Sequence, residues 1–95
     1  MKYKLVKTNR FQKDYALAIK RGLDISLLDG VIIMLANGQS LPARYKDHPL
    51  KGDHAGYREC HIQPDWLLVY RMEKDILVIV LSKMGRHGEL FKKRG

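Results

Sequence analysis

Three histidines and one aspartate stand where a folded chain could present them to a substrate. His61 and Asp65 flank the tight turn expected between two strand-like runs, "YRECHI" and "WLLVYRM". His48 precedes Pro49 in a loop, and His87 follows the end of a long apolar run. Imidazole titrates near neutral pH and can therefore remove or supply a proton. This set of side chains suits acid–base catalysis.

Cleavage of RNA is the reaction that this set favours. A ribose 2′-OH attacks the adjacent phosphate when one group takes its proton and another protonates the 5′-oxygen that leaves. Cationic side chains stabilise the charge that develops on the phosphorane. The chemistry requires no metal ion and no other cofactor, and we expect none.

Zinc binding is the competing use of these side chains. Cys60 and His61 are neighbours and would point to opposite faces of a strand. The sequence contains no C-x-x-C and no H-x-x-x-H spacing, which zinc sites commonly use. The pattern therefore disfavours a zinc site.

Aromatic and basic residues around the histidines are candidate contacts to RNA. Trp66 and Phe91 could stack on bases, a contact worth about 1 to 3 kcal/mol per base in single-strand binders. Trp66 lies inside an apolar strand and is equally suited to core packing, whereas a last helical turn would place Phe91 and His87 on one side. His54 lies among turn residues and reads as solvated. The candidate phosphate contacts are Lys46, Lys51, Arg58, Arg71, Lys83 and Arg86.

The charge of the chain limits its partners. Eighteen Lys and Arg residues against ten Asp and Glu give a formal net charge of +8. Such a balance attracts nucleic acid, an anionic membrane surface or an acidic protein. No apolar stretch of about 18 residues is present to span a membrane, and the N-terminus lacks the apolar run of a signal peptide. A single cysteine, Cys60, fits a reducing compartment, so we expect a cytoplasmic protein.

The elements that must position these residues follow the order β-α-α-β-β-β. Thr8 or Asn9 is expected to cap a first helix that stops at Gly22, and Asp24 to cap a second that ends at Asn37. Collection of the helices before most strands favours one α+β domain over residues 1–95. The expected strands cover 2–7, 57–62, 66–72 and 76–82, and a last short helical turn is expected within 86–93.

Periodicity predicts which side chains enter the core. The first helix directs Phe11, Tyr15, Ala18 and Ile19 to one face, and the second directs Ile25, Leu28, Ile32 and Leu35. The continuous apolar run at 76–82 predicts a central strand buried on both faces. In the strand at 57–62, alternation places Cys60 and Ile62 toward the core and Tyr57, Glu59 and His61 on the other face.

Two segments carry a resemblance to a known family. The segment "YKDHPLKGDHAGYRECHIQPDWLLVY", followed by "GRHGELF", resembles the YafQ family of bacterial toxins within the wider RelE/ParE superfamily. The likeness runs over nearly the whole chain and is densest from Ala43 to Tyr70. It implies a RelE-like fold, a small antiparallel sheet with two N-terminal helices packed on one side. It also implies a ribosome-dependent endonuclease that cuts mRNA in the ribosomal A site and is held inactive by a cognate antitoxin.

Position by position, the resemblance assigns roles to residues of this chain. The catalytic histidines of the family fall on His48, His61 and His87, its catalytic aspartate on Asp65, and its aromatic positions on Trp66 and Phe91. The segment "SKMGRHGELF" departs from the family pattern. It has Lys83 where related toxins often carry Arg, and Met84 and Arg86 where they carry small hydroxyl residues.

Two other functions remain open at this point. The chain could be a non-catalytic toxin that binds a protein target, as gyrase-poisoning members of the superfamily do, or a plain RNA-binding module. The first would not need three histidines, and the second would need only the basic surface and the aromatic residues. In the toxin interpretation the antitoxin is expected to be acidic, because opposite potentials speed encounter. It would contact the two-helix side and the basic patch. It would neutralise the toxin either by covering the site or by displacing the segment that carries His87.

Overall fold

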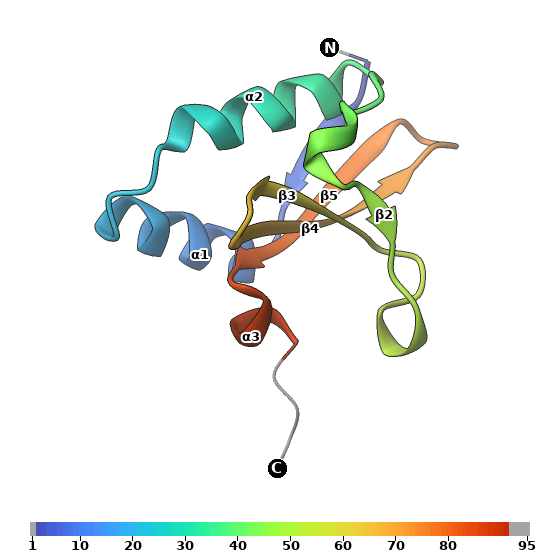
Figure 1. Cartoon of the computed structure of the whole chain (residues 1–95). Helices are drawn as coiled ribbons and strands as arrows, with labels where there is room; N and C mark the ends of the chain where they lie inside the picture. The colour runs from blue at the N-terminus through green and yellow to red at the C-terminus, as the bar shows by residue number, and fades with distance from the viewer. Residues whose placement is uncertain (1, 92–95) are drawn as a thin grey trace.

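The computed structural model describes residues 2–91, and its elements follow the expected order with short additions (Figure 1). The strands are β1 (Lys4–Lys7), β2 (His48–Pro49), β3 (Arg58–Gln63), β4 (Trp66–Glu73) and β5 (Val78–Gly85). The helices are α1 (Asn9–Lys20), α2 (Ile25–Ala36) and α3 (His87–Leu90), with 3-10 turns η1 (Ala43–Tyr45) and η2 (Gly52–His54). The two-residue strand β2 has no counterpart in the sequence-based expectation.

The strands form one sheet in the order β1-β5-β4-β3-β2. Neighbours from β5 to β2 are antiparallel, but β1 runs parallel to β5, so the sheet is mixed. Parallel neighbours require a long crossover connection, and here α1, α2 and the rest of the sheet separate β1 from β5. The expected α+β class, with both N-terminal helices on one side of the sheet, is confirmed (Figure 1).

The last strand differs from its expectation in position and in burial. Residues 74–77 form the turn after β4, where Ile76 is 70% exposed and Leu77 adopts a φ of 53°. The strand therefore starts at Val78 and continues to Gly85. Its burial alternates instead of being complete on both faces, because Ile79, Leu81 and Met84 face the main core whereas the opposite face of the strand is only partly covered.

The main core lies between the sheet and the two long helices. Thr8 caps α1 through a hydrogen bond from the Phe11 amide, and Asp24 caps α2 through one from Ser26. Ile19, expected to face this core, is instead exposed at the end of α1. The buried members of this core are Tyr3, Phe11, Ala18, Leu28, Val31, Ile32, Leu35, Cys60, Ile62, Trp66, Leu68, Tyr70, Ile79, Leu81 and Met84.

A second, smaller apolar cluster covers the opposite face of the sheet. It joins Leu67 and Val69 of β4 to Leu90 of α3, with half-buried residues around them. Alternation along β4 produces this division, since residues 66, 68 and 70 enter the main core and residues 67 and 69 the second cluster. The short helix α3 lies on the side of the sheet away from α2 (Figure 1). The face that it partly covers carries the histidines described below.

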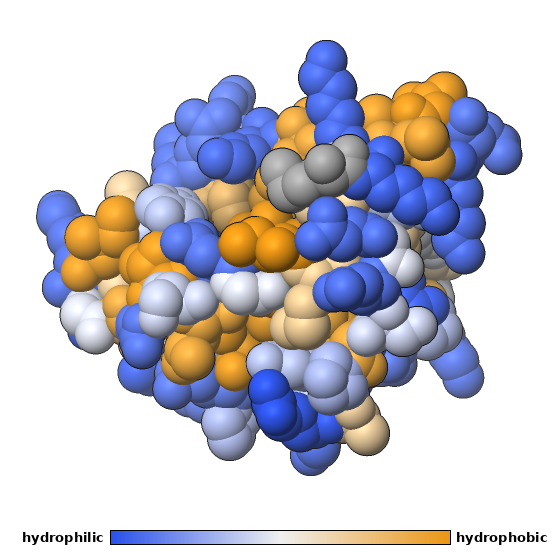
Figure 2. Space-filling view, turned by 90° about the horizontal axis from the view of Figure 1, so that it is seen from above, coloured by the Kyte–Doolittle hydropathy of each residue, from blue (hydrophilic) through white to orange (hydrophobic). Residues whose placement is uncertain are grey.

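The surface combines charge with scattered apolar side chains. Seen from the α2 side, hydrophilic surface is interrupted by separate apolar areas (Figure 2). Leu27 and Ile33 are the exposed large apolar residues of α2. Within residues 2–91 no helix is both long and apolar enough to cross a membrane.

Candidate active site

The β3–β4 hairpin fixes the position of His61. Gln63 pairs with Trp66 across a two-residue turn, and the strand register shifts between His61 and Gln63. Cys60 lies in the main core, where burial raises the pKa of its thiol to about 12 and keeps it neutral. Glu59 and His61 therefore point to the other face, as the alternation predicted.

Strand pairing brings a second histidine to this face. His48 of β2 pairs directly with Glu59 of β3. One carboxylate oxygen of Glu59, Oε1, lies 3.5 Å from Nε2 of His48 and 3.8 Å from Nε2 of His61. The two imidazole centroids are 6.5 Å apart. One carboxylate thus stands between two imidazoles.

The burial of Glu59 makes this arrangement unusual. Its side chain is only 6% exposed, and its second oxygen, Oε2, has no hydrogen-bond partner among residues 2–91. Buried carboxylates are normally paired or hydrogen-bonded because desolvating their charge is costly. Glu59 was not among the residues predicted to form the site. The sequence nevertheless contained an indication of its role, because Glu59 stands two positions before His61 and therefore on the same face of the strand.

The ring nitrogens of His48 and His61 face oxygen atoms that accept hydrogen bonds. Nδ1 of His48 lies 2.6 Å from the carbonyl oxygen of Lys46, which accepts and does not donate. Nδ1 of His61 lies 3.4 Å from the carbonyl of Pro64. Each ring thus has an oxygen acceptor near both nitrogens, and a neutral ring donates to only one of them. The other nitrogen of a neutral ring can accept a proton.

Asp47 fixes the loop that carries His48. Its carboxylate accepts a hydrogen bond from the Tyr70 hydroxyl at 2.5 Å and one from the Arg58 guanidinium at 3.0 Å. Burial, followed by the bond to Asp47, raises the pKa of Tyr70. Arg58, a predicted phosphate contact, is therefore already engaged by a carboxylate. The sequence analysis did not select Asp47, and only its position next to His48 could have pointed to it.

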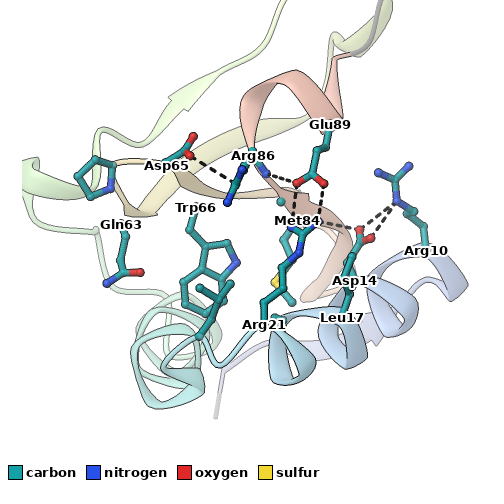
Figure 3. A pocket seen from close by; sticks show the side chains of 14 residues that line it. Arg10, Asp14, Leu17, Arg21, Gln63, Asp65, Trp66, Met84, Arg86 and Glu89 are labelled. Carbon is teal, nitrogen blue, oxygen red and sulfur yellow. Dashed lines mark hydrogen bonds and ion pairs between the residues drawn. The ribbon is translucent and has the colours of Figure 1, made fainter.

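Asp65 is not placed against His61 as expected. Its carboxylate faces Arg86, with Oδ2 3.5 Å from Nε, and both side chains are mostly exposed (Figure 3). The strand turn separates the two residues, and Nδ1 of His61 faces the Pro64 carbonyl instead. Asp65 thus contacts the residue that immediately precedes His87.

Trp66 belongs to the wall of an open groove and to the main core. The groove has a volume of about 800 Å³ and runs between α1, the hairpin turn and α3. Trp66 is 3% exposed, so the core-packing alternative is favoured and its ring is not available for base stacking in this structure. Three ion pairs rim the groove, Arg10–Asp14, Arg21–Glu89 and Arg86–Asp65 (Figure 3).

His87 stands at the start of α3 beside an aromatic ring. The centroids of His87 and Phe91 are 5.1 Å apart. Nζ of Lys83 lies 5.1 Å from the Phe91 ring and donates a hydrogen bond to the Leu90 carbonyl at 2.8 Å. Burial, and secondly Arg10, lowers the pKa of Lys83. His54, read as solvated, is half-buried and packs edge-on against Phe91 at 5.0 Å.

Glu89 attaches α3 to the rest of the fold. It accepts two hydrogen bonds from Arg21, at 2.9 and 3.2 Å, and one from the Arg86 amide at 3.0 Å. The Arg21 hydrogen bond is the main reason that the pKa of Glu89 falls to about 2. This attachment holds His87 and Phe91 over the second apolar cluster.

The remaining basic candidates divide into paired and exposed residues. Arg71 donates a hydrogen bond to the Tyr57 hydroxyl at 3.1 Å and forms an ion pair with Glu73. Lys46 and Lys51 are exposed near His48, and no ion pair engages either within the part of the chain that the structure describes. Val69 lies between the Glu59 site, which holds His48 and His61, and the Lys83–Phe91 site, which holds His87. It pairs with Glu59 on one side and with Lys83 on the other.

The described residues contain no arrangement of three or more His, Cys, Asp or Glu side chains that could hold a metal ion. His48, Glu59 and His61 are the nearest approach to such a group, but they lie at ion-pair distances. These distances exceed the roughly 2.0 to 2.2 Å of nitrogen and oxygen ligands to zinc.

Comparison with known proteins gives consistent matches over the whole fold. Residues 3–92 match the family described as the bacterial toxin of a type II toxin-antitoxin system, YafQ. The mRNA interferase toxin YafQ of Escherichia coli K12 is 40% identical over 85 residues, which cover 88% of this chain and 90% of that protein.

Two solved structures extend the match to three dimensions. YafQ in the crystal structure of the E. coli DinJ–YafQ complex has a TM-score of 0.86 and 37% identity, covering 94% of this chain and 98% of that one. A metal-bound toxin from Helicobacter pylori has a TM-score of 0.88 and 43% identity, covering 94% and 99%.

Proposed function

The chain belongs to the YafQ family of toxins of bacterial type II toxin-antitoxin systems, and we propose that it is an endoribonuclease that cuts mRNA on the ribosome. The convergence of His48 and His61 on the buried carboxylate of Glu59 carries this proposal. A protein that only bound a target or coated RNA would have no use for a costly buried charge between two imidazoles. Acid–base catalysis has such a use.

The pair of histidines on Glu59 acts at the 2′-OH end of the reaction. One of them removes the hydroxyl proton, and Glu59 stabilises the imidazolium that results, as a carboxylate behind a catalytic histidine does in other hydrolytic sites. His61 is the better placed of the two, because it lies at the hairpin turn, and His48 is its rival. The oxygen then attacks the adjacent phosphate.

His87 protonates the leaving 5′-oxygen from the other side of the apolar cluster. Its ring lies at the exposed start of α3, and Phe91 supports it at 5.1 Å. Lys83 and Arg86 are the nearest cations by sequence for the developing negative charge. Asp65 contributes through Arg86, whose guanidinium it faces at 3.5 Å, by holding the segment that leads into His87.

RNA contacts come from residues that the fold leaves accessible. Phe91 offers a half-buried ring at the edge of the cluster, whereas Trp66 is withheld in the core. Lys46 and Lys51 extend the positive surface beside His48. The remaining candidate contacts are Arg71, Lys83 and Arg86, while Arg58 serves the Asp47 anchor.

The partners follow from the family and from the charge. A basic toxin with an exposed RNA site requires an antitoxin, and the E. coli relative is seen in complex with DinJ. An acidic antitoxin complements the net charge of +8. The exposed Leu27 and Ile33 of α2 supply apolar contacts on the helix side. Action on ribosome-bound mRNA places the protein in the cytoplasm.

Substitution of two histidines tests the proposal. His61→Ala and His87→Ala should stop growth arrest and abolish mRNA cuts in cells expressing the toxin, while both variants unfold cooperatively. Lys20→Ala, at the exposed end of α1, is the control that should remain toxic. Wild-type cutting by both histidine variants would refute the acid–base site. Growth arrest with intact mRNA and inhibited gyrase would instead support a protein target.

A further inference from the structure

A separate hollow adjoins Phe91 through His54 and Lys83, which both line it and contact that ring. It has a volume of about 380 Å³ and opens between the start of α1, the loop before β3 and the end of β5. Val69 forms part of its lining, so the hollow continues the sheet face that carries Glu59. The other lining residues are Thr8, Arg10, His54, Tyr57, Ser82 and Lys83.

Two cations converge on this hollow, and the nearby carboxylate of Asp14 forms an ion pair with only one of them, Arg10. Lys83 forms no ion pair with any of residues 2–91, and its ammonium contacts only a carbonyl oxygen and the face of Phe91. Arg10 bonds Asp14 through Nε alone, which leaves its two terminal nitrogens without a partner among the described residues. Burial is the main cause of the lowered pKa of Lys83, repulsion by Arg10 lowers that pKa further, and the attraction of Asp14 offsets part of the decrease. An anion in the hollow would relieve that repulsion.

A β-bulge in β5 places Ser82 in the lining of the hollow. The register of β4 and β5 shifts between Val69 and Tyr70, so Ser82 is an extra residue between the partners of these two positions. Such bulges re-aim side chains and are frequent beside active sites. The Ser82 carbonyl accepts a hydrogen bond from the Thr8 hydroxyl at 2.5 Å, which ties the bulge to the start of α1.

Aromatic rings supply the remaining requirement of a nucleotide site. Tyr57 and His54 line the hollow, and His54 also contacts Phe91, whose other neighbour is His87. Rings stack on bases and sugars irrespective of sequence, while cations bind the backbone. The hollow therefore offers both cations for the phosphate and aromatic rings for the base. Only the ring of Phe91 separates His54 of the hollow from the catalytic candidate His87.

We propose that this hollow is a subsite for the nucleotide adjoining the cut, with its phosphate between Arg10 and Lys83 and its sugar and base against Tyr57 and His54. The subsite rests on the proposed RNA cleavage but has its own residues. Arg10, Tyr57, Ser82 and His54 gain a role in holding substrate, and none of them takes part in proton transfer.

Binding of a non-cleavable RNA tests the subsite. A trinucleotide with 2′-O-methyl groups should be titrated into isotope-labelled protein at several salt concentrations, with affinity measured from amide shifts. Shifts are expected at residues 8–10, 54–57 and 82–83 as well as at 59–61. Arg10→Gln should reduce the slope of log affinity against log salt by about 0.7, the value of one phosphate contact on a single strand.

Matched variants separate this contact from general charge. Lys13→Gln removes one exposed positive charge from the same helix outside the hollow, so its salt slope should equal that of the wild type. Arg10→Lys should restore the slope. Equal slopes for Arg10→Gln and Lys13→Gln, or no shifts in the hollow at millimolar RNA, would overturn the subsite. Neither result would affect mRNA cutting by the wild type, on which the proposed function stands or falls.

Discussion

The carboxylate of Glu59 lies 3.5 Å from the imidazole of His48, directly across the β2–β3 pairing, and is buried there with one oxygen unpaired. A fold selected only for stability would replace such a cluster of ionisable groups by well-packed apolar side chains, which is often neutral or stabilising. Retention of the charge is explained if catalysis uses it. This conflict between stability and chemistry is typical of active sites.

Glu59→Gln should therefore raise stability and lower activity together. Glutamine keeps the shape of the side chain and an amide oxygen that can accept from the imidazoles but removes the desolvated charge, so the fold should gain about 1 kcal/mol, which raises Tm by roughly 4 to 8 °C in a domain of this size. mRNA cleavage should fall at least about tenfold, because the imidazolium loses its counter-charge. Calorimetry and cleavage-site mapping on the same preparation give both numbers. A less stable variant with full activity would make Glu59 a structural residue.

Tyr70→Phe tests how His48 is held. The substitution removes the hydroxyl that donates to Asp47, leaving Arg58 as the side chain bonded to that carboxylate. Loss of this hydrogen bond should destabilise the fold by about 1 kcal/mol and should loosen the loop before β2. The Lys46–His48 amides should then exchange hydrogen faster, whereas exchange in α3 stays unchanged. Uniform acceleration across the chain would instead indicate global destabilisation.

Asp65 and Arg86 should behave as one unit in cleavage. If Asp65 acts through Arg86, Asp65→Asn and Arg86→Gln each lower mRNA cutting, and the double variant is no worse than the stronger single one. Stability should change by less than about 1 kcal/mol in all three, since the pair is exposed. Additive losses of activity would show that Asp65 acts on the substrate by itself, as the family resemblance implied.

Much of the fold was predictable because local patterns determine it. Thr8 and Asp24 cap the helices as expected, and the alternation in β3 correctly assigned Cys60 and His61 to opposite faces. The run at 76–82 misled because an apolar sequence does not reveal where a turn interrupts it, and Ile76 and Leu77 lie in that turn. The parallel pairing of β1 with β5 is a long-range choice that no local pattern contains.

The site was predictable in its residue types but not in its contacts. Three histidines could be named from sequence, but the pairing that brings His48 to Glu59 depends on β2, which is only two residues long. Asp65 was expected beside His61 because the two are near in sequence, yet the turn directs it to Arg86. The sequence alone left base stacking and core packing equally open for Trp66. Its burial in the structure favours core packing.

Acid should weaken the attachment of α3 through Glu89. Its folded pKa of about 2 lies below the usual value of 4.5, so the stabilisation is complete above pH 4.5 and is lost as the pH falls toward 2. The effect should remain below about 1 kcal/mol and shrink in salt, because the Arg21 pair is largely exposed. Urea unfolding between pH 2 and pH 6 should show this slope in the wild type and a reduced slope in Glu89→Gln. Identical slopes would contradict the assignment.

Removal of the proposed nucleophile tests RNA cleavage by this site most directly. Purified ribosomes should be programmed with an mRNA that carries a single 2′-deoxynucleotide at the mapped cut, next to an all-ribose control. If the 2′-OH attacks, the control is cut to leave a 2′,3′-cyclic phosphate or 3′-phosphate, and the deoxy message stays intact at that position. Cutting of the deoxy message at an equal rate, or products with a 5′-phosphate and a 3′-OH, would contradict attack by the 2′-OH.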